Sequence, residues 1–173
     1  MEQAEIIINT SMTKEDYKKF LYIATFRRNK LVIPMLILIS LVGGVIIGLN
    51  NGYFDVIKFI ISWILLFGLS IGVILFKIQR KNARRIKTDK TGTFDSVNTL
   101  KFFKDKIVME NKSINSTAEL DYDKFFSLME TKDYFIFYFT GNQAALIRKQ
   151  DIGDLKVFED FIIAKFEDRY KQI

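Results

Sequence analysis

The stretches LVIPMLILISLVGGVIIGL, residues 31–49, and VIKFIISWILLFGLSIGVILF, residues 56–76, decide how this chain folds. The first carries no charged residue, and the second carries only Lys58, close to its start. An α-helix rises about 1.5 Å per residue, so about 20 apolar residues cross the roughly 30 Å hydrocarbon core of a bilayer. The two stretches therefore predict a hairpin of two membrane-spanning helices.

The composition of the first stretch favours insertion into lipid. It holds thirteen Leu, Ile or Val residues, which at about 0.3–0.6 kcal/mol each contribute roughly 4–8 kcal/mol. Lys58 lies near the edge of the second stretch, where its long side chain can reach the lipid headgroups. The alternative is a pair of buried helices in a soluble bundle. Such helices normally carry a polar stripe, and neither stretch has one.

Basic residues flank the two stretches on one side only. Arg27, Arg28 and Lys30 precede the first, whereas the connection between them, residues 50–55, carries only Asp55. After the second stretch comes a set that we call the basic collar: Lys77, Arg80, Lys81, Arg84, Arg85 and Lys87. Positively charged flanks stay on the cytoplasmic side of a membrane. We therefore expect a multi-pass protein of the cytoplasmic membrane, with both ends of the chain in the cytoplasm and a short external loop.

The formal net charge of +6 is unevenly divided along the chain. Residues 1–90 hold fourteen basic and six acidic side chains, whereas residues 91–173 hold twelve basic and fourteen acidic ones. The basicity thus belongs to the juxtamembrane segment, residues 77–90. We expect the collar to anchor the topology and to lie against anionic lipid headgroups. Specific lipid recognition and nucleic-acid binding are alternatives, and we expect no nucleic-acid partner.

Small residues recur at every fourth position in both apolar stretches. They are Ser40, Gly44 and Gly48 in the first stretch, and Gly68 and Gly72 in the second. Such stripes let helix backbones approach closely in lipid. We expect them to pack the two helices of one chain together. Homo-oligomers formed through the same faces are the alternative.

Residues 1–30 predict an N-terminal strand followed by an amphipathic helix. Residues 5–12 are rich in β-branched side chains, which are typical of strands. Thr13 is typical of a helix N-cap, and Asp16 stands three positions later as its acidic partner. The apolar side chains that follow recur at helical spacing. This face requires cover from the bilayer surface or from the C-terminal domain.

Residues 91–173 predict a cytosolic domain in which a series of antiparallel strands is closed by one helix. The expected strands are 94–103, 106–111, 114–120, 124–130, 133–140 and 143–149. Residues 154–170 place Leu155, Phe158 and Ile162 on one helical face. The whole chain is therefore expected to be an α+β membrane protein, with a transmembrane hairpin over 31–76 and a half-barrel like that of pleckstrin-homology (PH) domains.

An aromatic run, Tyr134 to Phe139, is too short for a helical span. The turn residues Thr140, Gly141 and Asn142 follow it, so we expect a strand hairpin within the C-terminal domain. Its aromatic side chains are expected in the core. An exposed binding patch is the alternative.

Three blocks of the sequence carry a resemblance to a known family. They are FFKDKIVMEN (102–111), LDYDKFFSLMETKDYFIFYF (120–139) and QAALIRKQDI (143–152). With the layout of strand, helix, apolar hairpin and C-terminal domain, the chain resembles the YcxB-like proteins over nearly its full length. Tyr122 and Asp123 match the aromatic–acidic pair of that family, whereas Arg148 stands before Lys149 where the family often has proline. The resemblance implies a bacterial membrane protein of uncharacterised function, with no established catalytic residues.

The residue inventory argues against catalysis. The chain has no histidine and no cysteine, which excludes imidazole acid–base chemistry, thiol nucleophiles and most transition-metal sites. Glycine-rich phosphate loops are also absent from the sequence. The carboxylate pairs Asp121/Asp123 and Glu159/Asp160 are typical of solvated faces and turns. We expect no catalytic residues, no cofactor and no metal.

Three functions remain in competition. The favoured one is a membrane-anchored, non-catalytic binding or regulatory module that recognises a protein or peptide partner near the inner leaflet, because the domain is slightly acidic and so suits anionic headgroups poorly. The second is a structural protein that assembles as an oligomer through the small-residue faces. The third, a membrane-bound hydrolase that uses carboxylates, would require buried acids that converge.

Overall fold

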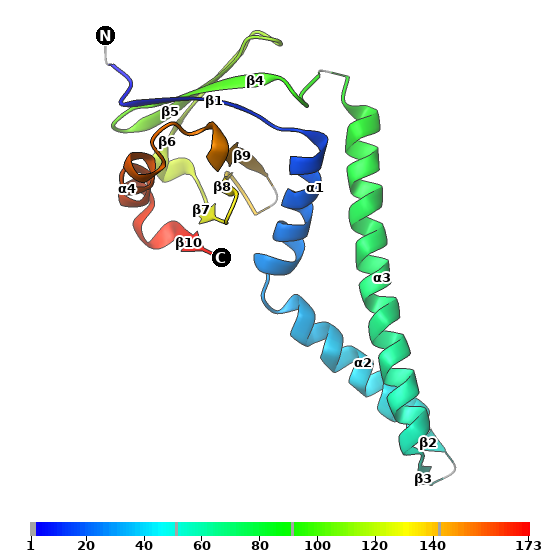
Figure 1. Cartoon of the computed structure of the whole chain (residues 1–173). Helices are drawn as coiled ribbons and strands as arrows, with labels where there is room; N and C mark the ends of the chain where they lie inside the picture. The colour runs from blue at the N-terminus through cyan, green and yellow to red at the C-terminus, as the bar shows by residue number, and fades with distance from the viewer. Residues whose placement is uncertain (1–2, 51, 91, 142) are drawn as a thin grey trace. The chain divides into compact units, whose positions relative to one another are not determined.

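The structure is a computed structural model that describes residues 3–50, 52–90, 92–141 and 143–173 (Figure 1). Asn51 of the expected loop, Thr91 at the expected start of the domain and Asn142 of the expected turn lie outside these ranges. The chain forms two compact units. The strand unit comprises Met1–Asp16 and Asp89–Ile173, and the helical unit comprises Tyr17–Thr88. The expected N-terminal segment, residues 1–30, is thus divided between them.

The helical unit contains two long helices joined by a very short connection. Its elements in chain order are the end of α1 (Lys14–Tyr22), a π-helical turn (Ile23–Arg27), α2 (Val32–Gly48), β2 (Leu49–Asn50), β3 (Tyr53–Phe54) and α3 (Val56–Thr88). Gly52 has a φ of 85° in the turn between β2 and β3, a conformation that glycine adopts without strain. The Asp55 carboxylate accepts a hydrogen bond of 3.0 Å from the amide of Lys58 and so caps the start of α3.

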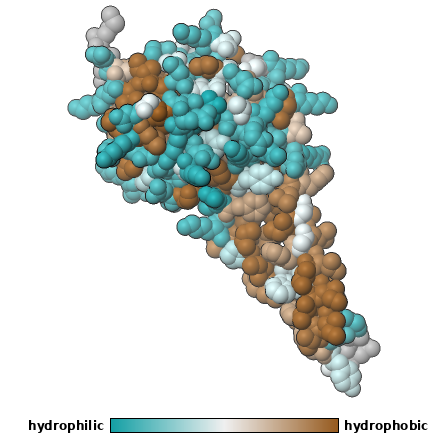
Figure 2. All heavy atoms as spheres, viewed as in Figure 1, coloured by the Kyte–Doolittle hydropathy of each residue, from teal (hydrophilic) through white to brown (hydrophobic). Residues whose placement is uncertain are grey.

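One helix, α3, is long and apolar enough to cross a membrane. Helix α2 passes the same test only together with the α1 segment, from which it is bent by 62°. Hydrophobic residues cover most of the visible surface of the helical unit near β2 and β3 (Figure 2). Helix α3 also continues through the basic collar to Thr88, so residues 77–88 of the juxtamembrane segment are part of the same helix.

The strand unit holds two four-stranded sheets. The first has the order β1-β4-β5-β6 and the second β10-β7-β8-β9. Their bounds are β1 (Ile6–Ser11), β4 (Val97–Phe102), β5 (Lys106–Asn111), β6 (Ser116–Asp121), β7 (Ser127–Glu130), β8 (Tyr134–Tyr138), β9 (Ala144–Arg148) and β10 (Tyr170–Gln172). All pairings are antiparallel except that of β10 with β7. An α+β fold with antiparallel sheets is confirmed, but the two sheets do not form a closed barrel.

The first sheet joins segments that are far apart in the sequence. Strand β1 pairs along its whole length with β4, from Ile6 opposite Phe102 to Ser11 opposite Val97. Nearly ninety residues, including the helical unit, lie between these two strands. The N-terminal strand is therefore an integral part of the domain that the C-terminal half of the chain builds.

Aromatic side chains between the two sheets and α4 (Leu155–Phe166) form the core. Asp154 caps α4 by accepting a 3.1 Å hydrogen bond from the amide of Val157, as its place in the sequence predicts. Phe158 of α4 lies edge-on to Phe102 of β4 and to Phe135 of β8, with ring centroids 5.1 Å apart in each case. These edge-to-face contacts add to the free energy gained by burial.

Strand β8 is buried on both faces. Phe135 and Phe137 belong to the core between the sheets, and Tyr134, Ile136 and Tyr138 on the opposite face are at most 3% exposed. The aromatic run that begins at Tyr134 is therefore interior, as expected, and these five residues do not form an exposed patch.

Candidate functional site

The basic collar forms one face of the last three turns of α3. All six side chains are exposed, and at about 100° per residue they fall within an arc of about 160°. Ile78, Asn82 and Ile86 lie outside this arc; Ile78 is buried and the other two are half-buried. Arg85 stands at the edge of the arc, where its charge acts on the hydroxyl of Tyr17. The collar is thus the solvent-facing side of an amphipathic helix end.

The two small-residue stripes differ in their surroundings. Ser40, Gly44 and Gly48 are buried on α2. A Cβ atom added to Gly44 would lie 3.1 Å from Cβ of Trp63 and 3.3 Å from the carbonyl oxygen of Phe59, both on α3. These contacts show that the α2 stripe packs against α3.

The stripe on α3 does not take part in this contact. A Cβ atom added to Gly68 or Gly72 would meet nothing within 4 Å among the described residues. The structure therefore brings one predicted stripe into the helix pair and leaves the other facing open space.

A polar cluster in the strand unit is organised by Arg148, at the end of β9. We call it the Arg148 cluster; its members are Thr10, Ser11, Asp16, Tyr134, Arg148 and Asp151. The guanidinium donates two hydrogen bonds, of 2.8 and 2.9 Å, to the carboxylate of Asp151 and one of 3.0 Å to the hydroxyl of Ser11. The cluster ties β1 to the end of β9.

Asp16 joins the Arg148 cluster to the start of α1. Its carboxylate accepts hydrogen bonds from the amide and hydroxyl of Thr13, which form the predicted capping pair. It also accepts a 2.7 Å hydrogen bond from the hydroxyl of Tyr134. Burial alone would raise the pKa of Asp16, but these hydrogen bonds and the charge of Arg148 hold that pKa below its usual value.

A second cluster lies around Lys149, the next residue along the chain. Its ammonium group donates to the carboxylates of Glu130 on β7 and, at 3.2 Å, of Glu159 on α4. It also lies 4.9 Å from the ring centre of Phe135. The hydroxyl of Tyr170 on β10 donates to Glu130. We call these four polar residues, Glu130, Lys149, Glu159 and Tyr170, the Lys149 cluster.

The Lys149 cluster has the electrostatics of a structural ion pair. Burial favours the neutral forms, yet the hydrogen bonds that Glu130 accepts from Lys149 and Tyr170 hold its pKa below the usual value. The pKa of Lys149 is raised, because its two carboxylate partners outweigh burial. General acids and bases are tuned in the opposite direction, toward neutral pH. The shifts of Glu130 and Lys149 instead stabilise the charged form of both groups.

Lowered carboxyl pKa values give the strand unit a predictable response to acid. For Asp16 and Glu130 the folded-state pKa lies below the unfolded-state value, so their contribution to stability is present above the unfolded value and is lost as pH falls through the folded one. We expect the thermal midpoint of unfolding to fall as pH drops below about 4.5. The thermal midpoint of the Glu130→Gln variant should fall less over the same pH interval. An equal loss in both proteins would contradict this prediction.

Of the two predicted carboxylate pairs, Glu159/Asp160 contributes Glu159 to the Lys149 cluster, whereas Asp121/Asp123 is not part of either cluster. Asp121 ends β6, whereas Asp123 lies in a 3-10 turn (Tyr122–Lys124) and pairs with exposed Lys124 at 3.1 Å. The chain turns between Asp121 and Asp123, so the two carboxylates do not share one strand. Within the described part of the chain, no group of three or more acidic side chains is arranged to hold a metal ion.

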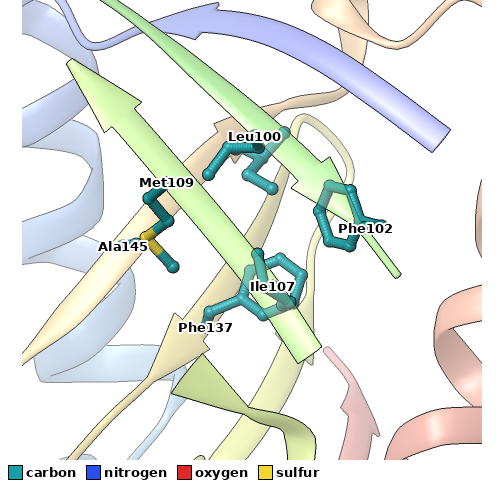
Figure 3. Close-up of a pocket in the computed structure, with 7 residues that line it drawn as sticks. Leu100, Phe102, Ile107, Met109, Phe137 and Ala145 are labelled. Atoms are coloured by element: carbon teal, nitrogen blue, oxygen red, sulfur yellow. The ribbon is translucent and has the colours of Figure 1, made fainter. Parts of the chain in front are cut away.

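A small apolar crevice opens between the two sheets. Leu100, Ile107 and Met109 of the first sheet face Phe137 and Ala145 of the second across it (Figure 3). Its free space is close to that of a single water molecule, which is too small for an organic cofactor. The crevice marks where the two sheets separate.

Part of the C-terminal domain matches a known protein family. Residues 102–162 match the model of the YcxB-like protein family. This segment is similar to the YcxB-like proteins. The match extends from the end of β4 into α4 and contains all three blocks on which the resemblance rests, which confirms the predicted family over this part of the chain. No curated protein and no solved structure gives a significant match.

Sequence reasoning missed both polar clusters of the YcxB-like domain. Arg148 and Lys149 lie side by side in one quoted block, but their side chains enter different clusters. Tyr134 and Asp16 are separated by 118 positions. The only local signal was the adjacent pair of charged residues, Arg148 at the end of β9 and Lys149 directly after it.

Proposed function

We propose that this chain is a two-span protein of the cytoplasmic membrane and that its YcxB-like domain is a non-catalytic module that binds a protein or peptide partner near the inner leaflet. In this proposal α2 and α3 form the transmembrane hairpin, both ends of the chain are cytoplasmic, and the two sheets with α4 form a PH-like half-barrel. The cytosolic domain then stays within reach of membrane-bound partners.

The observation that carries this proposal is the division of α3 into an apolar and a basic part. Its apolar part, residues 56–76, is about 31 Å long at 1.5 Å per residue, which equals the thickness of the hydrocarbon core. Side chains along it such as Leu65 and Leu69 are more than 60% exposed. Exposed leucines on this scale are stable in lipid and costly in water. The basic collar follows directly.

Helix α2 supports a second crossing. Its 17 residues give a length of about 26 Å, at the short end of the range for spanning helices. It packs against α3 through its small residues, while Leu38, Ile39 and Ile46 on its other faces are more than half exposed. The connection through β2 and β3 is too short to hold anything but a tight turn outside the bilayer.

The collar then lies at the inner headgroup layer. Helical side chains lean toward the helix N-terminus, which for α3 is the direction of the bilayer. Each basic residue near an anionic surface contributes about 1 kcal/mol. The YcxB-like domain, by contrast, is slightly acidic, which favours a protein or peptide over an anionic lipid as its ligand. Likeness to PH domains is not by itself a warrant for any ligand.

Thiol labelling tests the topology, since the chain has no cysteine of its own. We expect a membrane-impermeant maleimide to label the Tyr53→Cys variant in intact cells, because Tyr53 lies in the connection and is 81% exposed. The Ser113→Cys variant, which is exposed between β5 and β6, should be labelled only after lysis. Labelling of both variants, or of neither, in intact cells would contradict the proposal.

Photo-crosslinking from the domain tests the binding function. A photoreactive residue in place of Phe126, which is 59% exposed, should capture a distinct protein in cells that express the full chain. A photoreactive residue in place of Leu69 on α3 is the control for contacts made within the membrane. Capture of the same proteins from both positions would argue against recognition by the domain.

Assembly through the small-residue stripe of α3 is a second candidate function. The open space beside Gly68 and Gly72 favours it, because a small face that does not serve the helix pair is free to approach a second copy. Crosslinks between copies of the full chain that disappear in the Gly72→Leu variant would support this alternative.

A further inference from the structure

Strand β10 covers one edge of the second sheet. It runs parallel to β7, with Tyr170 opposite Leu128 and Gln172 opposite Glu130, and the amide of Ile173 donates a 2.9 Å hydrogen bond to the carbonyl of Glu130. Strand β7 is one of the most buried parts of the domain, whereas Lys171 and Gln172 on β10 are exposed. A well-packed edge is thus paired with a three-residue strand in which Tyr170 packs against the core and the two residues after it are exposed.

Two side chains account for the specificity of this pairing. The hydroxyl of Tyr170 donates to the carboxylate of Glu130. The guanidinium of Arg169 donates hydrogen bonds of 2.9 Å to the carbonyl oxygens of both Tyr122 and Phe125, in the turn before β7. The edge therefore offers two carbonyl acceptors for a planar cation, followed by a buried carboxylate for a phenol.

The connection from α4 to β10 contains a strained residue. Glu167 ends α4 with a φ of 44°, which is in the left-handed region that non-glycine residues rarely adopt. Segments with few buried contacts and strained hinges are the ones that open locally while the rest of a domain stays folded.

From these features we infer that the β7 edge is a strand-addition site for an extended segment with the sequence Arg-Tyr in a partner protein, and that β10 occupies it in cis. A partner segment would displace β10, pair with β7 and present its own arginine and tyrosine to the same acceptors. This inference rests on the proposed function and names the partner's recognition element. The chain's own Arg169-Tyr170 shows which chemistry the edge accepts.

The test uses a labelled peptide with the sequence of residues 167–173, EDRYKQI, as the probe. It is titrated into the full chain and into a chain that ends at Phe166, both in lipid nanodiscs. We expect the shortened chain to bind the peptide at least about tenfold more tightly than the full chain, in which β10 competes. The matched peptide EDQFKQI, which lacks both recognition groups, should bind about tenfold more weakly. A folded shortened chain that binds both peptides equally, or neither, would overturn the inference.

If the shortened chain does not fold, hydrogen exchange in the full chain tests whether β10 leaves the β7 edge. The amides of residues 170–173 should exchange about a hundredfold faster than those of β8, by local opening. Equal protection of the two segments would overturn the inference, because β10 would then be a permanent strand of the sheet.

A further crosslinking experiment identifies the protein that supplies the partner segment. Crosslinks from a photoreactive residue at Met129 to Tyr170 of a differently tagged copy would make the occupant a second copy and overturn the choice of a partner protein. Capture of a partner from Phe126 without peptide binding would overturn this inference alone and leave the proposed function intact.

Discussion

Replacing Lys149 by methionine should lower the free energy of unfolding of the YcxB-like domain by about 3–5 kcal/mol, the range for removing one partner of a buried ion pair. The Glu130 side chain is 5% exposed and that of Lys149 15%. Methionine fills the space of the lysine stem and its place over Phe135, but it leaves the Glu130 carboxylate without its cation. Urea unfolding of the full chain in detergent, followed by pulse proteolysis, measures the change.

Lys106→Met is the matched control for this prediction. Lys106 also pairs with a glutamate, Glu119 at 2.8 Å, and its ammonium group lies 5.9 Å from the ring centre of Phe103. The Glu119 side chain is 56% exposed, so water replaces the lost partner. We expect a loss below about 1 kcal/mol. Equal losses in the two variants would show that burial of the glutamate is not what makes Lys149 important.

A second substitution separates lost charge from lost packing. Adding Glu130→Gln to Lys149→Met removes the uncompensated charge and still leaves an acceptor for the hydroxyl of Tyr170. The double variant should therefore be more stable than Lys149→Met alone. If it is less stable, the lysine acts through its packing against Phe135 rather than through the ion pair.

Local patterns were sufficient to predict most elements of this fold. The two apolar stretches match α2 and α3 to within a residue at three of four ends, because nothing but a helix satisfies the backbone in so long an apolar run. Thr13 marks the start of α1, as predicted. Asp154, the first residue of the predicted helix 154–170, caps α4. Helix α3 runs past residue 76 because residues 77–88 consist largely of Lys, Arg, Gln and Ala, which are strong helix formers.

Contacts between distant segments could not be predicted in the same way. Nothing in residues 5–12 indicates that their partner is β4, and the three residues of β10 are too few to carry a pattern. The Arg148 cluster joins three regions of the chain. Each of its residues, taken alone, is typical of the strand, turn or cap in which it stands. Tertiary packing brings them together, and no single stretch of sequence records it.

Replacing Gly44 by leucine should separate α2 from α3. A Cβ atom at this position would already lie 3.1 Å from Cβ of Trp63 and 3.3 Å from a backbone oxygen of α3, and the remaining leucine atoms have no space. Because the backbone of α3 cannot yield without moving the helix, we expect the pair to lose about 1–3 kcal/mol or more. Leucine is more apolar than glycine, so insertion itself is not weakened.

The chain contains a built-in reporter for this contact. Trp63 is its only tryptophan, and it lies where α2 crosses α3. SDS titration of the protein in mild detergent, followed by Trp63 fluorescence, should show a lower midpoint for Gly44→Leu than for the unmodified chain. The matched control is Gly68→Leu, the same substitution on a face where a Cβ atom meets no described atom within 4 Å. Its midpoint should stay unchanged.

The same pair of variants separates the two proposed functions. If the spans serve only to form a hairpin that holds the YcxB-like domain at the membrane, Gly44→Leu is the damaging change and Gly68→Leu is silent in every assay. If the spans assemble copies of the chain, Gly68→Leu should abolish crosslinks between copies while the SDS midpoint remains unchanged, because the face beside Gly68 is free within one chain. Assembly of copies thus predicts that Gly68→Leu is a damaging change, whereas the hairpin function predicts that it is silent. The two functions differ in this way because only the α2 stripe is already used in packing within one chain.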